Sequence, residues 1–152
     1  MASGSGRGPL NYTTTIDAGK SASECVALLA RHGASRTSID WAGGHPHSIA
    51  FGIDTPAGMR FYTLPANVEG VRRALNRAWE ARRISGSYTG EAQALRVAWR
   101  VVKDWLEAQL AMIDAQVVEL EQVMLPYMVV DEVGTTVYER YIAQGHRAEI
   151  EG

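Results

Sequence analysis

The chain has 152 residues, of which 46% are hydrophobic and 21% charged, and its formal net charge is −2. This balance excludes a disordered or fibrous protein and predicts one globular domain with its own hydrophobic core. The single cysteine, Cys25, excludes an internal disulfide, and no apolar run is long enough to span a bilayer, so we expect a soluble cytoplasmic protein with no membrane partner.

The N-terminal part of the chain predicts a strand followed by a helix. Residues 1–10 are rich in glycine and serine and are interpreted as a flexible tail or an expression remnant, so the domain is expected over residues 11–144. Alternating β-branched residues predict a strand over residues 11–17. Ser21 followed by Glu24 has the pattern of a capping box, and Gly33 suits a helix end, which together predict a helix from about residue 22 to residue 32.

Three short strands are predicted next, over residues 36–41, 47–54 and 59–64. Turn residues separate them, with a Gly-Gly pair in the first connection and Thr-Pro-Ala-Gly in the second. In the middle strand Ile49, Phe51 and Ile53 point to one side while small or polar residues point to the other. The pattern indicates an antiparallel meander with one buried face.

Helices follow the meander. Asn67 is expected to cap a helix with a basic outer face, and Thr89 to cap a long helix that ends near Leu125. A final short helix, capped by Thr136 and Glu139, is expected to end near residue 144, before a flexible tail over residues 145–152. The predicted fold is therefore α+β in the order β-α-β-β-β-α-α-α, with helices on one face of a small antiparallel sheet and one long C-terminal helix.

The predicted long helix raises the question of a second subunit. About 35 residues at 1.5 Å each reach roughly 50 Å, whereas a domain of this size is about 40 Å across. We therefore hypothesise a homodimer through this helix, with Trp99, Val101, Trp105 and Met112 in the interface. The alternative is that the helix is covered by neighbours from its own chain.

No strong catalytic or cofactor motif is present. Residues 19–21 (Gly-Lys-Ser) lack the preceding glycine of a phosphate-binding loop, and no Ser-His-Asp order, HExxH or CxxC occurs. Cys25 lies on the apolar face of its helix and is interpreted as a core residue. His45 and His47 flank a proline in a hairpin, so we expect no metal and no cofactor there, although a metal-dependent hydrolase stays open as a minor alternative.

Charge is unevenly distributed along the chain. Residues 1–66 hold five basic and four acidic side chains, residues 67–103 eight and three, and residues 104–152 two and ten. The basic block consists of Arg72, Arg73, Arg77, Arg82, Arg83, Arg96, Arg100 and Lys103. Arginine suits phosphate through its planar fork, so this block predicts a nucleic-acid-binding edge. The competing interpretation is a solvated helix face with Arg100–Asp104 and Lys103–Glu107 ion pairs.

Four stretches of the chain are distinctive: TPAGMRFYTLPANVEGV (55–71), RVAWRVVKDWLEAQLAMI (96–113), LEQVMLPYM (120–128) and TVYERY (136–141). In them, and over residues 11–144 as a whole, the chain resembles a family of small uncharacterised proteins encoded by bacteriophages and prophages. The resemblance implies a phage origin and a place in the host cytoplasm, and it supplies no site residues. Roles in phage DNA replication or recombination, in inhibiting host defence, or in binding a host protein fit that setting.

Two hypotheses about function follow from the sequence. The first is a non-enzymatic phage-type accessory protein, dimeric, that binds DNA or RNA through the arginine-rich edge. The second is a protein-interaction module, in which the acidic C-terminal half or the helix carrying Trp99 and Trp105 docks on a host or phage protein.

Overall fold

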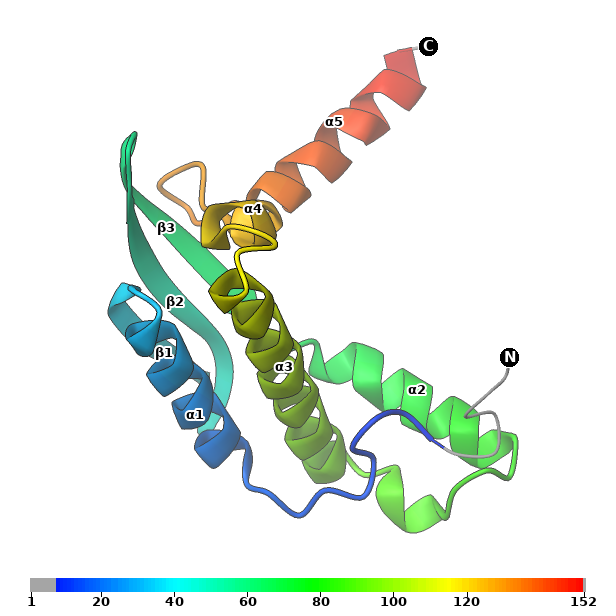
Figure 1. Ribbon diagram of the computed structural model, residues 1–152. Helices are drawn as coiled ribbons and strands as arrows, with labels where there is room; N and C mark the ends of the chain where they lie inside the picture. The colour runs from blue at the N-terminus through cyan, green and yellow to red at the C-terminus, as the bar shows by residue number, and fades with distance from the viewer. Residues whose placement is uncertain (1–7, 152) are drawn as a thin grey trace.

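The computed structural model describes residues 8–151, with side chains as far as residue 145; residues 1–7 of the expected tail lie outside that range. Over it the chain is α+β, as predicted, with five α-helices and one three-stranded sheet. In Figure 1, α1 (Ala18–Arg31) and α3 (Glu91–Asp114) lie side by side along the sheet, and α2 (Val68–Glu80) packs on another side of α3. The element order begins with α1, so the order predicted from the sequence is corrected.

The sheet is an antiparallel meander, as predicted. Its strands β1 (Ser35–Ala42), β2 (His45–Thr55) and β3 (Gly58–Pro65) pair in chain order, and each extends slightly beyond the predicted range. In the first connection Gly43 and Gly44 have φ values of 60° and 80°. Left-handed backbone at both central positions is what a two-residue type I′ hairpin requires, and glycine adopts it without steric cost.

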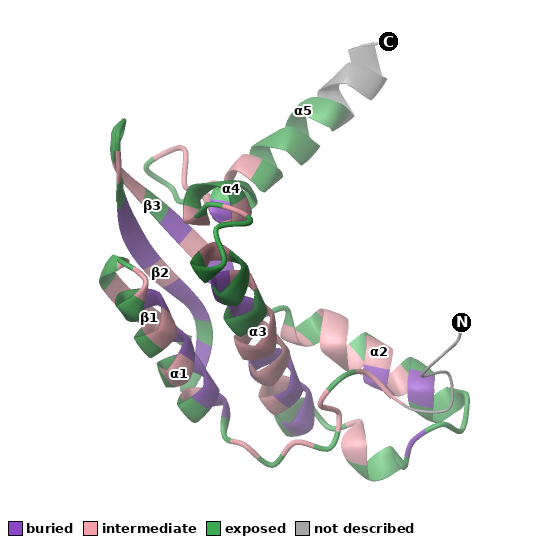
Figure 2. Cartoon of the chain, in the orientation of Figure 1, coloured by how far each residue is buried: buried purple, intermediate pink, exposed green. Residues whose placement is uncertain are grey.

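One face of the sheet is closed by α1 and α3, and it carries most of the core. Ile49 and Phe51 of β2 and Tyr62 of β3 have at most 1% of their surface exposed, and the Phe51 and Tyr62 rings stack with centroids 5.4 Å apart. From α3, Trp99 enters the same core and its indole Nε1 donates a hydrogen bond to the carbonyl oxygen of Pro46 at 2.9 Å. Figure 2 shows the buried residues gathered on the strands and on α1 and α3.

The predicted strand over residues 11–17 is wrong, because side chains of α3 hold this segment in place of a neighbouring strand. The Nε2 of Gln93 donates to the carbonyl oxygens of Tyr12 and Thr14 at 2.8 and 3.0 Å. Asn11 adopts a φ of 64° and donates through Nδ2 to a carboxylate of α3 at 2.7 Å. The segment therefore forms turns along α3 and no ladder.

The first helix begins one turn earlier than predicted, because Asp17 caps it. The Asp17 carboxylate accepts a hydrogen bond from the backbone N–H of Gly19 at 3.0 Å. Ser21, the predicted cap, is fully buried inside α1, and its hydroxyl oxygen accepts a hydrogen bond from Arg100 at 3.4 Å. The predicted capping box of Ser21 and Glu24 is thus wrong, whereas the predicted Asn67 cap of α2 is confirmed by its bond from the Gly70 N–H at 2.8 Å.

Three helices end in the same hydrogen-bond arrangement, in which a left-handed residue follows the helix. After α1 this residue is Gly33, with φ 94°, which confirms the predicted helix stop. After α2 and α3 it is Arg82 and Gln116, with φ 60° and 61°. In each case an N–H donates to the carbonyl five residues earlier: Ala34 to Leu29, Arg83 to Ala78, and Val117 to Met112.

The predicted long helix is divided into two. A 3-10 turn, η1 (Gly86–Tyr88), precedes α3, whose N-cap is Gly90 and not Thr89. The helix ends at Asp114, and the chain turns before α4 (Leu120–Met124). At 24 residues α3 is about 36 Å long and fits along the sheet, so its length no longer requires a second subunit. Within residues 8–151 no helix is both long and apolar enough to cross a membrane.

His32 connects the ends of α1 and α3. Its Nδ1 lies 2.8 Å from the carbonyl oxygen of Leu28 and its Nε2 3.1 Å from the carboxylate of Asp114. Both partners accept hydrogen bonds, so the bond to Leu28 and then that to Asp114 raise the pKa of His32 in the folded state.

The expected result is a loss of stability as the pH rises. A raised folded-state pKa means that the protonated histidine contributes fully below its unfolded value of about 6.5 and that the contribution disappears as pH passes the folded value. For this partly exposed pair we expect about 0.5 kcal/mol less unfolding free energy at pH 8.5 than at pH 6. Urea denaturation at both pH values measures it. In Asp114→Asn the difference should shrink, and an unchanged difference would contradict the assignment to this pair.

The C-terminal part returns to β3 and then leaves the body. After η2 (Leu125–Tyr127), the N–H of Val129 donates to the carbonyl oxygen of Phe61 at 2.8 Å. The predicted cap of the last helix is confirmed, because the Thr136 hydroxyl accepts from the Glu139 N–H while the Glu139 carboxylate accepts from the Thr136 N–H. That helix, α5 (Val137–Glu151), runs about two turns past its predicted end, through the segment interpreted as a tail, and projects from the body in Figure 1.

Candidate nucleic-acid interface

The basic residues of the predicted edge lie on different sides of α3. Arg96, Arg100 and Lys103 belong to α3. Arg100 bonds to Glu24 of α1, and Arg96 bonds to Gln93, whose side chain also donates to the N-terminal segment. The others lie on α2 and in the turn that follows it: Arg72, Arg73, Arg77, Arg82 and Arg83. Because α1 and α2 flank α3 on different sides (Figure 1), the bonds of Arg96 and Arg100 direct the α3 set toward α1 and the N-terminal segment, away from the α2 set of the predicted edge.

The three residues of α3 are engaged within the protein. Arg96 donates twice to the side-chain oxygen of Gln93, at 3.1 and 2.6 Å. Arg100 pairs with Glu24 of α1 at 2.9 Å and not with Asp104 as predicted. The predicted Lys103–Glu107 pair is confirmed at 2.7 Å. The side chains of Arg100 and Lys103 are each only 15% exposed, so this set has little surface to offer a phosphate, and it is less solvated than the competing interpretation expected.

Arg72 is also paired, at the start of α2. Its guanidinium donates two hydrogen bonds to the carboxylate of Glu69, at 2.6 and 3.0 Å. The bonds from Arg72 lower the pKa of Glu69, so the carboxylate stays charged. This pair lies in solvent, and Arg72 is left with little capacity for a phosphate.

Four arginines of the predicted edge, on α2 and in the turn after it, are without an ion pair to a described residue. Arg73, Arg77, Arg82 and Arg83 are exposed, and none forms an ion pair with a residue that the structure describes. We call these four residues the α2 arginine cluster. Glu80 is the acidic residue within its span, so the segment 73–83 carries a positive excess. An unpaired positive surface of this kind attracts phosphate.

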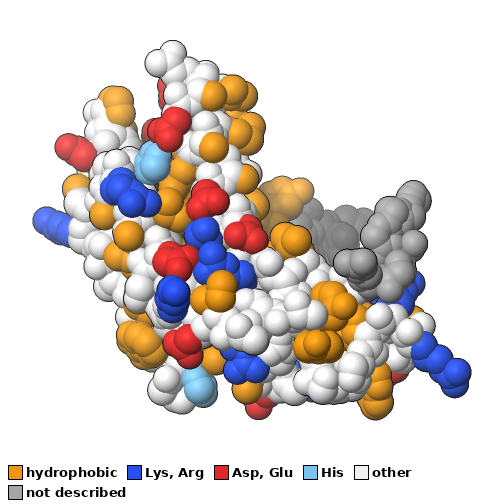
Figure 3. Space-filling model, turned by 60° about the horizontal axis from the view of Figure 1, so that its bottom comes forward, with side chains coloured by type: hydrophobic (Ala, Val, Ile, Leu, Met, Phe, Trp, Pro, Cys, Tyr) orange, Lys and Arg blue, Asp and Glu red, His pale blue; other side chains and the backbone are white. Residues whose placement is uncertain are grey.

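Arg77 and Arg83 line one hollow of the surface. It has a volume of about 390 Å³, and its other walls are small: Gly8, Pro9, Ala74, Ala78 and Ala81. Figure 3 shows acidic and basic side chains interspersed over the middle of the molecule, with further basic side chains projecting at the right-hand edge. Two positive side chains therefore stand on the walls of one hollow at the surface.

The backbone at Arg82 distinguishes it from an ordinary surface arginine. Its φ of 60° places it in the left-handed region, and its position is the one at which glycine usually follows a helix. A side chain at this position costs about 1 kcal/mol relative to glycine. Sequence reasoning missed this feature, because an arginine gives no local signal of left-handed backbone.

His45 and His47 do not form a metal site in this structure. Both are exposed on β2 and line a hollow that Glu91 also borders. Within the described residues, however, no group of three or more His, Cys, Asp or Glu side chains is placed to hold a metal ion. The metal-dependent hydrolase interpretation therefore gains no support from the geometry.

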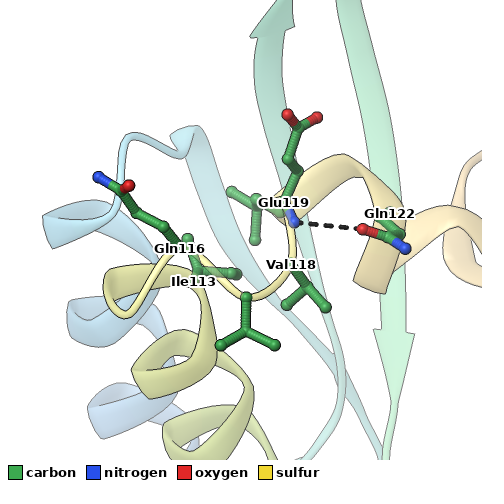
Figure 4. Close-up of a pocket in the computed structure, with 7 residues that line it drawn as sticks. Ile113, Gln116, Val118, Glu119 and Gln122 are labelled. Carbon is green, nitrogen blue, oxygen red and sulfur yellow. Dashed lines mark hydrogen bonds between the residues drawn. The ribbon is translucent and has the colours of Figure 1, made fainter.

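The other candidate groups also lack a catalytic arrangement. Cys25 is fully buried, and burial, with a smaller effect of Glu24, raises the pKa of its thiol to about 12, so the nucleophilic thiolate is scarce. A hollow of about 620 Å³ lies at the turn between α3 and α4, lined by Ile113, Gln116, Val117, Val118, Glu119, Leu120 and Gln122 (Figure 4). Glu119 is its sole ionisable lining residue, and the backbone N–H of Glu119 donates to the side-chain oxygen of Gln122 at 3.4 Å. Neither site offers an acid–base pair.

The residues proposed for a dimer interface have different surroundings. Trp99 has no exposed surface, so its assignment to an interface is corrected. Trp105 packs edge-to-face on Tyr127 with centroids 6.0 Å apart. Val101 is half-buried, and Met112 is 39% exposed near the end of α3. The apolar surface of α3 is therefore used mainly inside the chain, as the alternative interpretation of this helix predicted.

Comparison with known proteins adds no relative. No protein-family model, curated protein or solved structure matches this chain. The resemblance to phage-encoded proteins stays a prediction.

Proposed function

We propose that this protein is a non-enzymatic, phage-type accessory protein that binds nucleic acid through the α2 arginine cluster. The observation that carries the proposal is the exposure of Arg73, Arg77, Arg82 and Arg83 without an acidic partner among the described residues. The proposed binding surface contains four of the eight basic residues that the sequence predicted. A place beside phage DNA replication or recombination is part of the same proposal.

The backbone of Arg82 supports this choice of surface. Strained residues that persist where glycine would be better are concentrated at functional sites. Among the described residues, the side chain of Arg82 has no ion-pair partner that could account for its presence. Binding of a ligand by its guanidinium supplies a reason for tolerating the strain.

The chemistry of the cluster favours phosphate over a base edge. Arginine presents a planar fork that matches phosphate oxygens, and contacts of this kind position a protein on the backbone without reading sequence. We therefore expect similar affinity for different sequences. Four contacts predict a log–log slope of affinity against salt of about −3 to −4.

The test is a titration of fluorescently labelled single- and double-stranded DNA and RNA at low and near-physiological salt, followed by anisotropy. The wild-type chain should bind with that salt slope. Arg82→Gly should bind about fivefold more weakly and yet unfold with about 1 kcal/mol more free energy, because it loses one contact and relieves the left-handed strain.

Gln116→Gly is the matched control for Arg82→Gly. Gln116 occupies the same left-handed position after α3, so this variant should gain similar stability and keep wild-type affinity. No binding by the wild-type chain even at low salt would end the nucleic-acid proposal. If Arg82→Gly bound nucleic acid as tightly as Gln116→Gly does, Arg82 would not be part of the interface.

The protein-interaction hypothesis placed the contact surface on α3, but the structure favours a different helix for it. Trp99 is buried and Trp105 packs on Tyr127, so the two tryptophans of α3 present little exposed surface to a partner protein. The exposed tyrosines of α5, Tyr138 and Tyr141, favour an interaction role for that helix instead.

A further inference from the structure

An exposed tryptophan lies within the span of the α2 arginine cluster. Trp79 is in the last turn of α2 and is 50% exposed. A tryptophan usually lies in a core or an interface, because its side chain buries a large apolar area. Among the described residues, no other aromatic ring pairs with Trp79 and no arginine lies over its ring. The exposed half of the indole is therefore available to a ligand.

The turn after α2 holds this indole in place. A Cβ added at Gly86 would lie 3.1 Å from the indole Nε1 and 3.4 Å from Cε2, so the backbone of η1 packs directly against the ring. The φ of Gly86 is not left-handed, so the need for glycine here comes from this close approach. One side of the indole is thus fixed against its own chain while the rest faces solvent.

The same turn contains two arginines of the cluster. The N–H of Arg82 donates to the carbonyl oxygen of Trp79 at 2.8 Å, and the N–H of Arg83 donates to that of Ala78 at 2.9 Å. Because Gly86 contacts the indole, residues 79–86 form a loop whose two ends touch, and both arginines lie within it. Arg83 and Ala78 also line the hollow described above. The indole and the arginines therefore share one end of α2.

Charge complementarity indicates the kind of ligand that fits an indole among arginines. The span holds the four arginines of the cluster and one carboxylate, Glu80, so it attracts a polyanion. Proteins that bind single-stranded nucleic acid combine cationic side chains for the phosphates with aromatic rings on which bases stack. In a duplex each base is already stacked between its neighbours, so only an unpaired base has a face to offer.

We infer that the α2 arginine cluster binds single-stranded nucleic acid, with one unpaired base stacked on Trp79 and the adjoining phosphates on the arginines. This inference rests on the proposed function and narrows its ligand. Stacking adds affinity with little dependence on base identity. It releases no counterions, whereas each phosphate contact does, so salt separates the two contributions.

Anisotropy titrations of labelled oligothymidylate, oligouridylate and a DNA duplex, each about 12 nucleotides or base pairs long, test the inference. The wild-type chain should bind the single strands more tightly than the duplex at near-physiological salt. Trp79→Leu keeps apolar bulk and removes the ring, so it should bind single strands about tenfold more weakly and the duplex unchanged. Its log–log salt slope should equal that of the wild-type chain. Tighter binding of one single strand than the other would assign the ligand to DNA or to RNA.

Two further variants separate stacking from a structural role of Trp79. Trp79→Phe keeps a ring for stacking and should retain most of the single-strand affinity. Trp41→Leu removes an exposed tryptophan from β1 and should bind all three probes as the wild-type chain does. Saturation with oligothymidylate should quench tryptophan emission in the wild-type chain and in Trp41→Leu, because a stacked base quenches an indole. This quenching should be absent in Trp79→Phe.

The possible failures are distinguishable. Unchanged single-strand affinity in Trp79→Leu, or an equal loss on single strands and duplex, would overturn the inference and leave the phosphate-binding proposal standing. If Trp79→Leu did not fold, unquenched emission of the saturated wild-type chain would overturn it instead. No binding of any probe by the wild-type chain at low salt would end the nucleic-acid proposal together with this inference.

Discussion

Replacing Trp99 by alanine is expected to lower the free energy of unfolding by about 4 kcal/mol. The indole has no exposed surface between α3 and the sheet, so its removal opens a large cavity. It also removes the donor that lies 2.9 Å from the Pro46 carbonyl oxygen at the start of β2. A loss of this size is a large part of the 5–15 kcal/mol that a small domain has, and urea denaturation followed by circular dichroism measures it.

Trp41→Ala is the matched control for this substitution. Trp41 is 58% exposed at the end of β1, so its loss should change the unfolding free energy by no more than about 0.5 kcal/mol. Trp99→Phe separates the two contributions, because it keeps most of the ring volume and loses the hydrogen bond. Equal effects of Trp99→Ala and Trp41→Ala would contradict the burial of Trp99 within its own chain.

The sheet was predictable because its signals are local. Alternation of Ile49, Phe51 and Ile53 with small or polar residues sets the buried face of β2, and a Gly-Gly pair sets the first turn. Both features act over a few neighbouring residues, where a period of two and left-handed glycine leave few alternatives. Gly33, Asn67 and Thr136 mark helix ends by similarly local chemistry.

The errors concern elements that distant residues decide. Residues 11–17 have strand propensity, but Gln93, about 80 positions away, satisfies their carbonyl groups. Likewise α3 ends at Asp114 without glycine or proline, through Gln116 in a left-handed conformation. The apolar spacing continues through α4, so periodicity alone could not locate the break.

The candidate site shows the same division between local and distant effects. The sequence identified which segment is basic, but it could not show which arginines are free. The partner of Arg100 is Glu24, 76 positions away, and that of Arg96 is Gln93, held by the N-terminal segment. Such pairings depend on how α1, α2 and α3 pack, so the reduction from eight residues to the α2 arginine cluster required the structure.

Reversing two charges of the α2 arginine cluster should have the largest effect on nucleic-acid binding. In Arg82→Glu with Arg83→Glu, two phosphate contacts are replaced by repulsion, so we expect roughly 30-fold weaker binding, about 2 kcal/mol, on every sequence tested. The log–log salt slope should fall by about two. Anisotropy titrations at several salt concentrations give both quantities.

The control for this variant is Lys20→Glu with Arg31→Glu, which changes the net charge equally. Both residues are exposed on α1, away from the end of α2. If the cluster is the interface, this control should lose affinity only slightly and keep its salt slope, because long-range attraction between separated charges is screened beyond roughly 8–10 Å. Equal weakening by the two double variants would mean that binding follows net charge alone, and the α2 arginine cluster would then no longer be a defined site.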